Sequence, residues 1–294
     1  MELLTTAEAA NYLRLKERKI YEMVAEGTVP CTKVTGRWLF PKAELDHWLV
    51  ASISRPDGLT RPEAPPIVAG SHDPLLEWAL RESGCGLATL AVGSEAGFTR
   101  FTAGEVVAAA VHLHALDDPA ADANVAAMAG RGDMQDAVMI AFCRREQGFL
   151  VAPGNPLKIG SIGDVIARRA RTAMRPKGAG AQLLLLALLH RVEAPLEKLA
   201  SVTPLCPTGP DIAQAIRAGR ADTGIASRAV ANAAGLDFVS IAWEPFDLVM
   251  RQRDYFRPPL QALIKFLHSD DLAARAKEMG GYDLTGTGSV RFAV

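Results

Sequence analysis

The chain lacks several features that mark common classes of protein. Its four cysteines lie far apart in the sequence and form no CxxC or Cys/His ligand spacing, so we expect neither a zinc site nor a disulfide framework. The longest apolar run, AQLLLLALL, is too short to span a bilayer, and no secretion signal precedes the first predicted helix. These absences predict a cytoplasmic protein with reduced, buried thiols and no membrane partner.

An excess of one charge is also missing. The 294 residues carry a formal net charge of −1, so any contact with DNA must be local. The motifs GxGxxG, GxxxxGK[ST] and GxSxG are absent, and Ser71, His72 and Asp73 are too close in sequence to converge as a catalytic triad. We therefore expect no cofactor and no enzymatic activity. The spacing of His112 and His114 does not match a metal site either.

The first fifty residues carry the pattern of two helices joined by a tight turn. The hydroxyl of Thr5 or Thr6 can cap the first helix, and Ala9 belongs to a set of small apolar residues that allow close approach of the second helix. The second helix opens at Lys16 and turns Ile20 toward the core. This part of the pattern predicts a helix-turn-helix.

A predicted hairpin and a third helix follow. Gly27 fits the left-handed position that ends a helix. Thr35 and Gly36 separate two short extended segments and form the expected turn between them. Pro41 is expected to occupy the first turn of the last helix, where a missing backbone N–H costs nothing. Together these elements predict a winged helix-turn-helix in residues 1–52.

The segments AEAANYL, KERKIYEMVAEGTVP and GRWLFPKAELDHWL resemble the excisionase-type, MerR-like winged helix-turn-helix family over roughly residues 3–50. The resemblance implies double-stranded DNA as a partner. Its DNA contacts, together with Tyr21, which the helical pattern turns outward, are expected at Lys16, Arg18, Lys19, Tyr21, Lys33 and Arg37. The alternative is a charged, solvated helix in a small protein-interaction module.

The rest of the chain alternates short apolar runs with helical patterns. Prolines and charges in SISRPDGLTRPEAPP predict a linker over residues 53–66. Beyond it, the α/β alternation predicts parallel sheet covered by helices, and this pattern restarts after VMIAFCRREQGFLVAPGNP. We expect residues 67–294 to form a two-lobed α/β clamshell, with lobe 1 at about 67–143 and 247–294 and lobe 2 at about 148–243.

The segments AGSHDPLLEWAL, LAVGSEAGF, GEVVAAAVHLH, ARTAMRPKGAGAQLLL and TGPDIAQAIRAGRADTGIAS resemble the type 2 periplasmic-binding-protein-like domain. The similarity is to cytoplasmic copies that are fused to helix-turn-helix heads and related to molybdate- and tungstate-binding proteins. It implies an anion held between the lobes by loops that end strands and begin helices. The ligand-binding residues expected from those loops are Ser71, His72, Ser94, Arg175, Lys177, Gly178, Gly180 and Thr208.

One loop departs from the pattern of those relatives. Where they commonly have a GSGT-like sequence, this chain reads GAGA, so Ala179 and Ala181 supply no hydroxyl groups. The loop then binds through backbone amides and neighbouring cations, or the ligand is a different one. The hydroxyls of Ser71, Ser94 and Thr208 also have an alternative role as helix N-caps.

These features together predict a one-component transcriptional regulator. The head reads DNA as a homodimer, because such heads usually bind paired half-sites, and a small molecule or oxyanion closes the cleft of the body. The alternative is a cytoplasmic small-molecule binding protein, or an adaptor, whose head does not bind DNA.

Overall fold

The computed structural model describes residues 2–34, 36–51, 63–114, 122–129, 134 and 136–293. The chain divides into an N-terminal unit and a larger C-terminal unit, which are taken in turn. Residues 53–62, which make up most of the predicted linker, lie outside the described residues, as does residue 52. No helix in the described ranges has the length and apolar character needed to cross a membrane.

The N-terminal unit contains three helices and a three-stranded antiparallel sheet of order β1-β3-β2. Its elements are β1 (Leu3–Thr5), α1 (Thr6–Tyr12), α2 (Glu17–Ala25), β2 (Thr32–Val34), β3 (Arg37–Pro41) and α3 (Lys42–Ala51). Thr5 caps α1 and forms a capping box with Glu8, as the sequence predicts. Ala9, Ile20 and Phe40 are fully buried in the core of this unit.

Pro41 corrects one prediction for this unit. It does not open the last helix but ends β3, opposite Leu3, and α3 begins at Lys42. The reason is β1, which was not predicted: its three residues pair with β3 and keep the chain extended through Pro41. Gly27 has φ +65, as expected for a helix end. Thr35, in the predicted hairpin turn, lies outside the described residues.

The C-terminal unit is built on one sheet in which eight strands follow the order β5-β4-β6-β11-β7-β10-β8-β9, while β12 and β13 also pair with β7. The strands are β4 (Ile67–Gly70), β5 (Ala88–Ala91), β6 (Ala108–Val111), β7 (Ala137–Val151), β8 (Arg171–Ala173), β9 (Ala200–Val202), β10 (Thr223–Ser227), β11 (Asp237–Arg251), β12 (Tyr282–Asp283) and β13 (Val290–Ala293). The predicted parallel pairing is present within β4–β6 and within β8–β10, whereas the central strands pair antiparallel.

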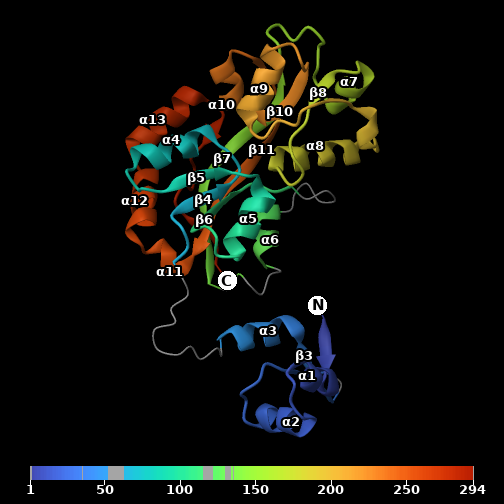
Figure 1. Ribbon diagram of the computed structural model, residues 1–294, viewed down its shortest axis with the longest axis vertical. Helices are drawn as coiled ribbons and strands as arrows, with labels where there is room; N and C mark the ends of the chain where they lie inside the picture. Colours follow the sequence, from blue (N-terminus) through green and yellow to red (C-terminus); the bar gives the residue numbers. More distant parts are fainter. Residues whose placement is uncertain are drawn as a thin grey trace. The chain divides into compact units, whose positions relative to one another are not determined.

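Helices pack against both ends of this sheet and form two lobes with it. They are α4 (Pro74–Glu82), α5 (Ser94–Thr102), α6 (Ala123–Ala129), α7 (Ile162–Ala167), α8 (Gly180–Arg191), α9 (Gly209–Arg217), α10 (Arg228–Ala234), α11 (Gln252–Tyr255), α12 (Pro258–Leu267) and α13 (Asp270–Met279), with a short 3-10 helix at Leu196–Lys198. We call the part around β4–β6 the first lobe and the part around β8–β10 the second lobe. In Figure 1, β7 and β11 run side by side through the centre of this unit and pass from one lobe to the other.

Each lobe has its own core. In the first lobe, apolar side chains of α4, α12 and α13 pack against β4, β6, β7 and β11, with Leu75, Leu263 and Leu272 fully buried. In the second lobe, separate apolar clusters form around α8 and around α9 and α10, as Leu184 and Ile212 illustrate. Two packed lobes joined by two long strands leave the space between them for polar groups.

Candidate functional site

A small cavity lies between the two lobes, at the β7 crossing. Its volume of about 20 Å³ is roughly that of one water molecule. Its polar lining comes from both lobes and from β7: Ser71, His72, His112, Arg145, Gln147, Arg175 and Ser227. Side chains that are up to 156 positions apart in the sequence therefore meet at one place, because β7 carries the chain from one lobe to the other.

Arg145 of β7 is the centre of this site, and its side chain is only 2 % exposed. Its Nε donates to Glu244 Oε1 on β11 at 2.9 Å, and its Nη1 donates to Asp73 Oδ2 at 2.9 Å. The guanidinium also lies over the ring of Phe246, with 4.1 Å from Cζ to the ring centroid. Asp73 caps α4 through its other oxygen, so the start of that helix is tied to Arg145.

The charges in this group stabilise one another. Burial opposes the charge on Arg145, but Glu244 and Asp73 outweigh it and raise the pKa of Arg145 above its usual value. Burial likewise opposes ionisation of Glu244, yet the charge of Arg145 and the hydrogen bond with His114 hold the pKa of this carboxyl well below its usual range. The site therefore contains a buried cation between two carboxylates.

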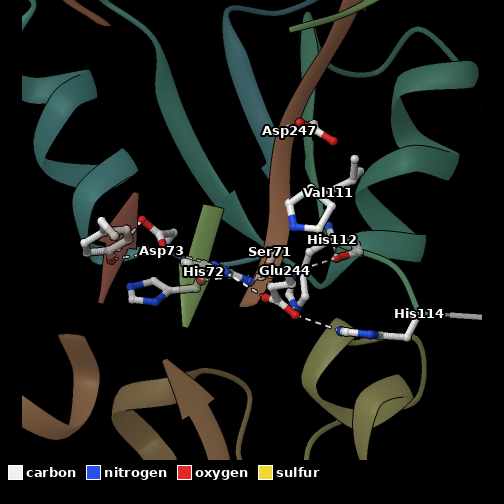
Figure 2. Close-up of polar contacts among 12 residues, drawn as sticks. Ser71, His72, Asp73, Val111, His112, His114, Glu244 and Asp247 are labelled. Carbon is white, nitrogen blue, oxygen red and sulfur yellow. Dashed lines mark hydrogen bonds and ion pairs between the residues drawn. The ribbon is translucent and has the colours of Figure 1, made fainter. Parts of the chain in front are cut away.

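His112, which follows β6, is neutral in this setting. Burial, and then the positive charge of Arg145, lower the pKa of His112 well below its usual value. Arg145 Nη2 donates to His112 Nδ1 at 2.6 Å, so the ring proton of the neutral form is on Nε2. Figure 2 shows the contact between Glu244 and His114, in which Oε2 lies 2.7 Å from His114 Nε2, and Glu244 Oε1 lies 3.5 Å from His112 Nε2.

Arg175, a predicted ligand-binding residue, is a second cation at the cavity and is half-buried. Its Nη2 donates to the carbonyl oxygen of Pro207 at 2.7 Å, while its Nε has no hydrogen-bond partner in the described part of the chain. It forms no ion pair with a carboxylate of the described residues. Burial, and then repulsion from Arg145, lower the pKa of Arg175 to about 10, so it is still charged at neutral pH.

The two residues predicted from the first loop, Ser71 and His72, also line the cavity. Arg145 Nη2 lies 3.4 Å from Ser71 Oγ. His72 Nε2 lies 3.2 Å from Glu77 Oε2, and its Nδ1 is buried without a partner among the described residues. The loop after β4 thus contributes both a hydroxyl and a ring nitrogen to the site.

Other predicted residues surround the cavity without lining it. Ser94 is the first residue of α5 and is fully buried, with its Oγ accepting from the backbone N–H of His112 at 3.2 Å. Thr208 caps α9 in a capping box with Asp211, which was the structural alternative for this hydroxyl. Lys177 is exposed. The backbone of the GAGA loop contacts the first lobe instead: Glu95 N donates to the carbonyl oxygen of Gly178 at 3.2 Å.

Gly180 has a steric role at the same contact. A Cβ atom at this position would overlap the ring of His112, so α8 can begin here only with glycine. The second glycine of the GAGA loop therefore allows the second lobe to approach His112 of the first. Its predicted role in ligand binding stays a prediction.

Sequence reasoning missed Arg145, Gln147 and Glu244. A signal was present, because RREQ and WEP place charged or polar residues inside long strands that are otherwise apolar. Charged side chains inside a buried strand need partners, and the pairing of β7 with β11 supplies them. In the described ranges no three His, Cys, Asp or Glu side chains come together as a metal site.

The predicted DNA-binding residues all lie exposed on the N-terminal unit. Lys16 precedes α2, Arg18, Lys19 and Tyr21 lie in its first half, and Lys33 and Arg37 lie in the β2–β3 hairpin. The side chain of Arg18 is 91 % exposed and lies 3.2 Å from Glu22. Lys33 Nζ lies 5.2 Å from the centroid of the Trp38 ring. Such exposed pairs contribute little to stability, so these cations are available to a partner.

Comparisons with known proteins agree with this architecture. A family model described as a PBP superfamily domain matches residues 77–268, and one described as a helix-turn-helix domain matches residues 3–50. The solved structure of "the tungstate ABC transporter from Geobacter sulfurreducens" is similar to 73 % of this chain and 99 % of its own, with a TM-score of 0.50 and 13 % identity. At that identity the similarity shows the fold alone.

Two curated relatives match parts of the chain. The "Uncharacterized protein YvgK" of Bacillus subtilis is 27 % identical over 146 residues, which cover 50 % of this chain and 47 % of the relative. The chain thus matches about half the length of that relative. A Clostridium pasteurianum protein, "Uncharacterized protein in ferredoxin 2Fe-2S gene 5'region", is 28 % identical over 80 residues, or 27 % of this chain and 71 % of its own. Since the first family model spans more than half of the sequence, the chain belongs to the family defined by the PBP superfamily domain, here joined to a helix-turn-helix domain.

Proposed function

We propose that the protein is a one-component transcriptional regulator, which binds double-stranded DNA through its head and a small anion between its lobes. The observation that carries the proposal is Arg175, a half-buried cation with a buried, unpartnered Nε, at the cavity of a chain that also has a helix-turn-helix domain. A partly buried cation without a carboxylate partner costs free energy, and an anionic ligand would reduce that cost.

The geometry around Arg175 supports an anion in particular. Gly209, the first residue of α9, and Ala181, in the first turn of α8, line the same cavity. The first N–H groups of a helix have no partner within the helix, and the helix dipole favours negative charge at that end. Molybdate and tungstate, which the resemblance in the sequence implies, belong to this class of ligand.

The exposed cations of the head support binding to DNA. Arg18 and Lys19 lie in the first turn of α2, where a recognition helix meets bases and phosphates, and Lys33 and Arg37 lie in the wing. We further propose a homodimer that reads paired half-sites, and a cytoplasmic location as required for access to DNA.

DNA binding is tested by selecting sequences from random duplexes with the full-length protein and titrating them by fluorescence anisotropy at several salt concentrations. Each phosphate contact that is lost should reduce the slope of log affinity against log salt by about one. The double substitution Arg18→Ala with Lys19→Ala should therefore weaken binding strongly and flatten the slope. Arg275→Ala, which removes an exposed ion pair to Glu278 in the C-terminal unit, serves as the control.

The outcomes separate the proposal from its rivals. A protein-interaction adaptor would show no salt-dependent binding to any duplex. A protein that only stores or delivers its ligand would bind the ligand normally and show the same DNA signal with and without the double substitution. Either result would overturn the regulatory part of the proposal.

A further inference from the structure

We infer that the ligand of the cavity is an anion that carries a hydrogen-bond donor of its own, such as a protonated tetrahedral oxyanion or a small hydroxycarboxylate. This inference rests on the proposed function and narrows its class of ligand. It distinguishes the ligand from molybdate, tungstate and sulfate, whose oxygens carry no proton at neutral pH. The hydrogen-bonding groups and the charges at the cavity carry the inference.

Two buried acceptors at the cavity have no partner in the ranges that the structure describes. One is Oε1 of Gln147, whose side chain is buried on β7. The other is Nδ1 of His72, which is an acceptor in the neutral tautomer whose proton is on Nε2, the nitrogen that faces Glu77. With the Gln147 amide and the His72 ring in this arrangement, a ligand made only of acceptor oxygens would leave both groups unsatisfied and would place lone pairs against them. A ligand O–H group would satisfy one of them.

The buried donors at the same cavity fit the other end of such a ligand. Arg175 Nε–H has no partner among the described residues, whereas the Nε2–H of His112 lies beside Gly180 and 3.5 Å from Glu244 Oε1. The cavity therefore offers donors from Arg175 and its surroundings and acceptors from Gln147 and His72. A molecule with an anionic oxygen and a hydroxyl group complements both sets.

The balance of charge points the same way. Arg145 is already paired with Asp73 and Glu244, both within 2.9 Å, so these three groups together are not positive. Arg175 is then the one cation of the cavity lining, as described, that lacks a carboxylate partner. One unpaired cation matches one negative charge better than two, because an uncompensated buried charge is expensive.

The lining also sets the size of the ligand. Gly209 and Ala181 are among the lining residues, and with the lobes in this arrangement the cavity has room for about one water molecule. A ligand of several atoms enters only when the lobes move apart, so compact anions are the natural probes.

Two matched pairs of probes test the inference by isothermal titration calorimetry of the full-length protein at neutral pH. Phosphate and sulfate share a shape, but only phosphate keeps a proton; glycolate and acetate differ by one hydroxyl group. We expect the donor-bearing member of one pair to bind at least about tenfold more tightly than its partner, because the unsatisfied acceptor rejects the other. The pair that shows the preference identifies the ligand as an inorganic oxyanion or a hydroxycarboxylate.

Variants link the preference to named groups. Gln147→Met keeps the length of the side chain and removes its acceptor oxygen. His72→Phe keeps an aromatic ring and removes its acceptor nitrogen. Either substitution should reduce the ratio between the affinities for the donor-bearing and the donor-free probe of the preferred pair. Gln214→Met, at an exposed position of α9, should leave the ratio unchanged. Thermal unfolding of each variant confirms that it is folded, and either cavity variant alone suffices for the test.

Failure of this inference differs from failure of the proposed function. Binding of sulfate, molybdate or tungstate that is as tight as, or tighter than, that of the better of phosphate and glycolate would overturn the inference of a donor-bearing ligand. That result would leave the protein as an anion sensor. A ratio that both cavity variants leave unchanged would also overturn it. If none of the six anions bound at millimolar concentration, both the inference and the anion-sensing part of the proposed function would be wrong.

Discussion

Two arginines meet at the cavity between the lobes, and they are in opposite situations. Arg145 is surrounded by Asp73, Glu244 and the ring of Phe246, so its charge is compensated within the protein. Arg175 has only a carbonyl oxygen and an unused Nε among the described groups. Arg145 therefore serves the architecture of the site, and Arg175 is the residue whose charge a ligand can use.

Arg175→Gln should lower affinity for any anion that binds the cavity by at least about tenfold, since a hydrogen bond to a charged group contributes about 1.5–3 kcal/mol. The thermal stability without ligand should be unchanged or higher, because the substitution removes an unpaired, partly buried charge. Calorimetry and thermal unfolding measure the two effects. Arg168→Gln, on the exposed end of α7, is the control, and equal loss in both variants would contradict the role of Arg175.

Asp247 on β11 leads to a prediction about pH. Burial raises the pKa of this carboxyl from 3.8 to about 6, although Asn124 and Arg291 contact it. The folded state thus holds the proton more tightly than the unfolded chain, so this group lowers the free energy of unfolding as pH rises from about 4 to 6. The stability of Asp247→Asn relative to wild type should rise over that interval, by up to about 3 kcal/mol.

Denaturant unfolding at several pH values measures this difference. Asp283→Asn gives a control of opposite sign, because hydrogen bonds from Thr285 lower the pKa of the half-buried Asp283. That variant should lose stability relative to wild type as pH rises. A flat difference for Asp247→Asn would show that its carboxyl titrates normally in the folded state.

At the scale of elements, the start of α8 determines how closely the lobes approach. Gly180 lies against the His112 ring, and the preceding turn accepts a hydrogen bond from the start of α5 through the carbonyl oxygen of Gly178. These contacts join the helix of one lobe to the strand end and helix of the other. Changes at this junction should therefore affect both stability and ligand binding.

Gly180→Ala should destabilise the protein by about 1–3 kcal/mol, because the added methyl group overlaps the buried ring of His112. It should also weaken ligand binding, since α8 and His112 both border the cavity. Gly163→Ala in α7 is the matched control: the nearest atom to its Cβ is the Ser161 Oγ at 3.5 Å, and alanine favours a helix there. Equal stability of the two variants would contradict the steric role of Gly180.

At the scale of the whole molecule, the proposed function requires the two units to influence each other. If the anion changes the affinity for DNA by some factor, DNA must change the affinity for the anion by the same factor. We expect a factor of about 5 to 150, the usual range for such coupling, measured by anisotropy with saturating anion and by calorimetry with saturating DNA. A factor of one in both directions would leave a binding protein whose head acts independently.

The sequence by itself determined the local elements of this protein. The capping residue Thr5 and the helical pattern after Lys16 placed the first two helices, and the alternation of apolar runs with helical patterns indicated the α/β body. The resemblance to known families indicated both parts of the fold, and the family models confirm them. Short-range patterns suffice here because caps and periodicity depend on residues only a few positions apart.

Only the tertiary structure decided which groups meet in the cleft. Arg145 and Glu244 are 99 positions apart, and the register of β7 against β11 brings them together. Pairing of β1 with β3 made Pro41 part of a strand, and the packing of α8 against the end of β6 placed Gly180 against His112. Such contacts depend on how whole elements pack, and a linear pattern carries no record of that packing until the chain is folded.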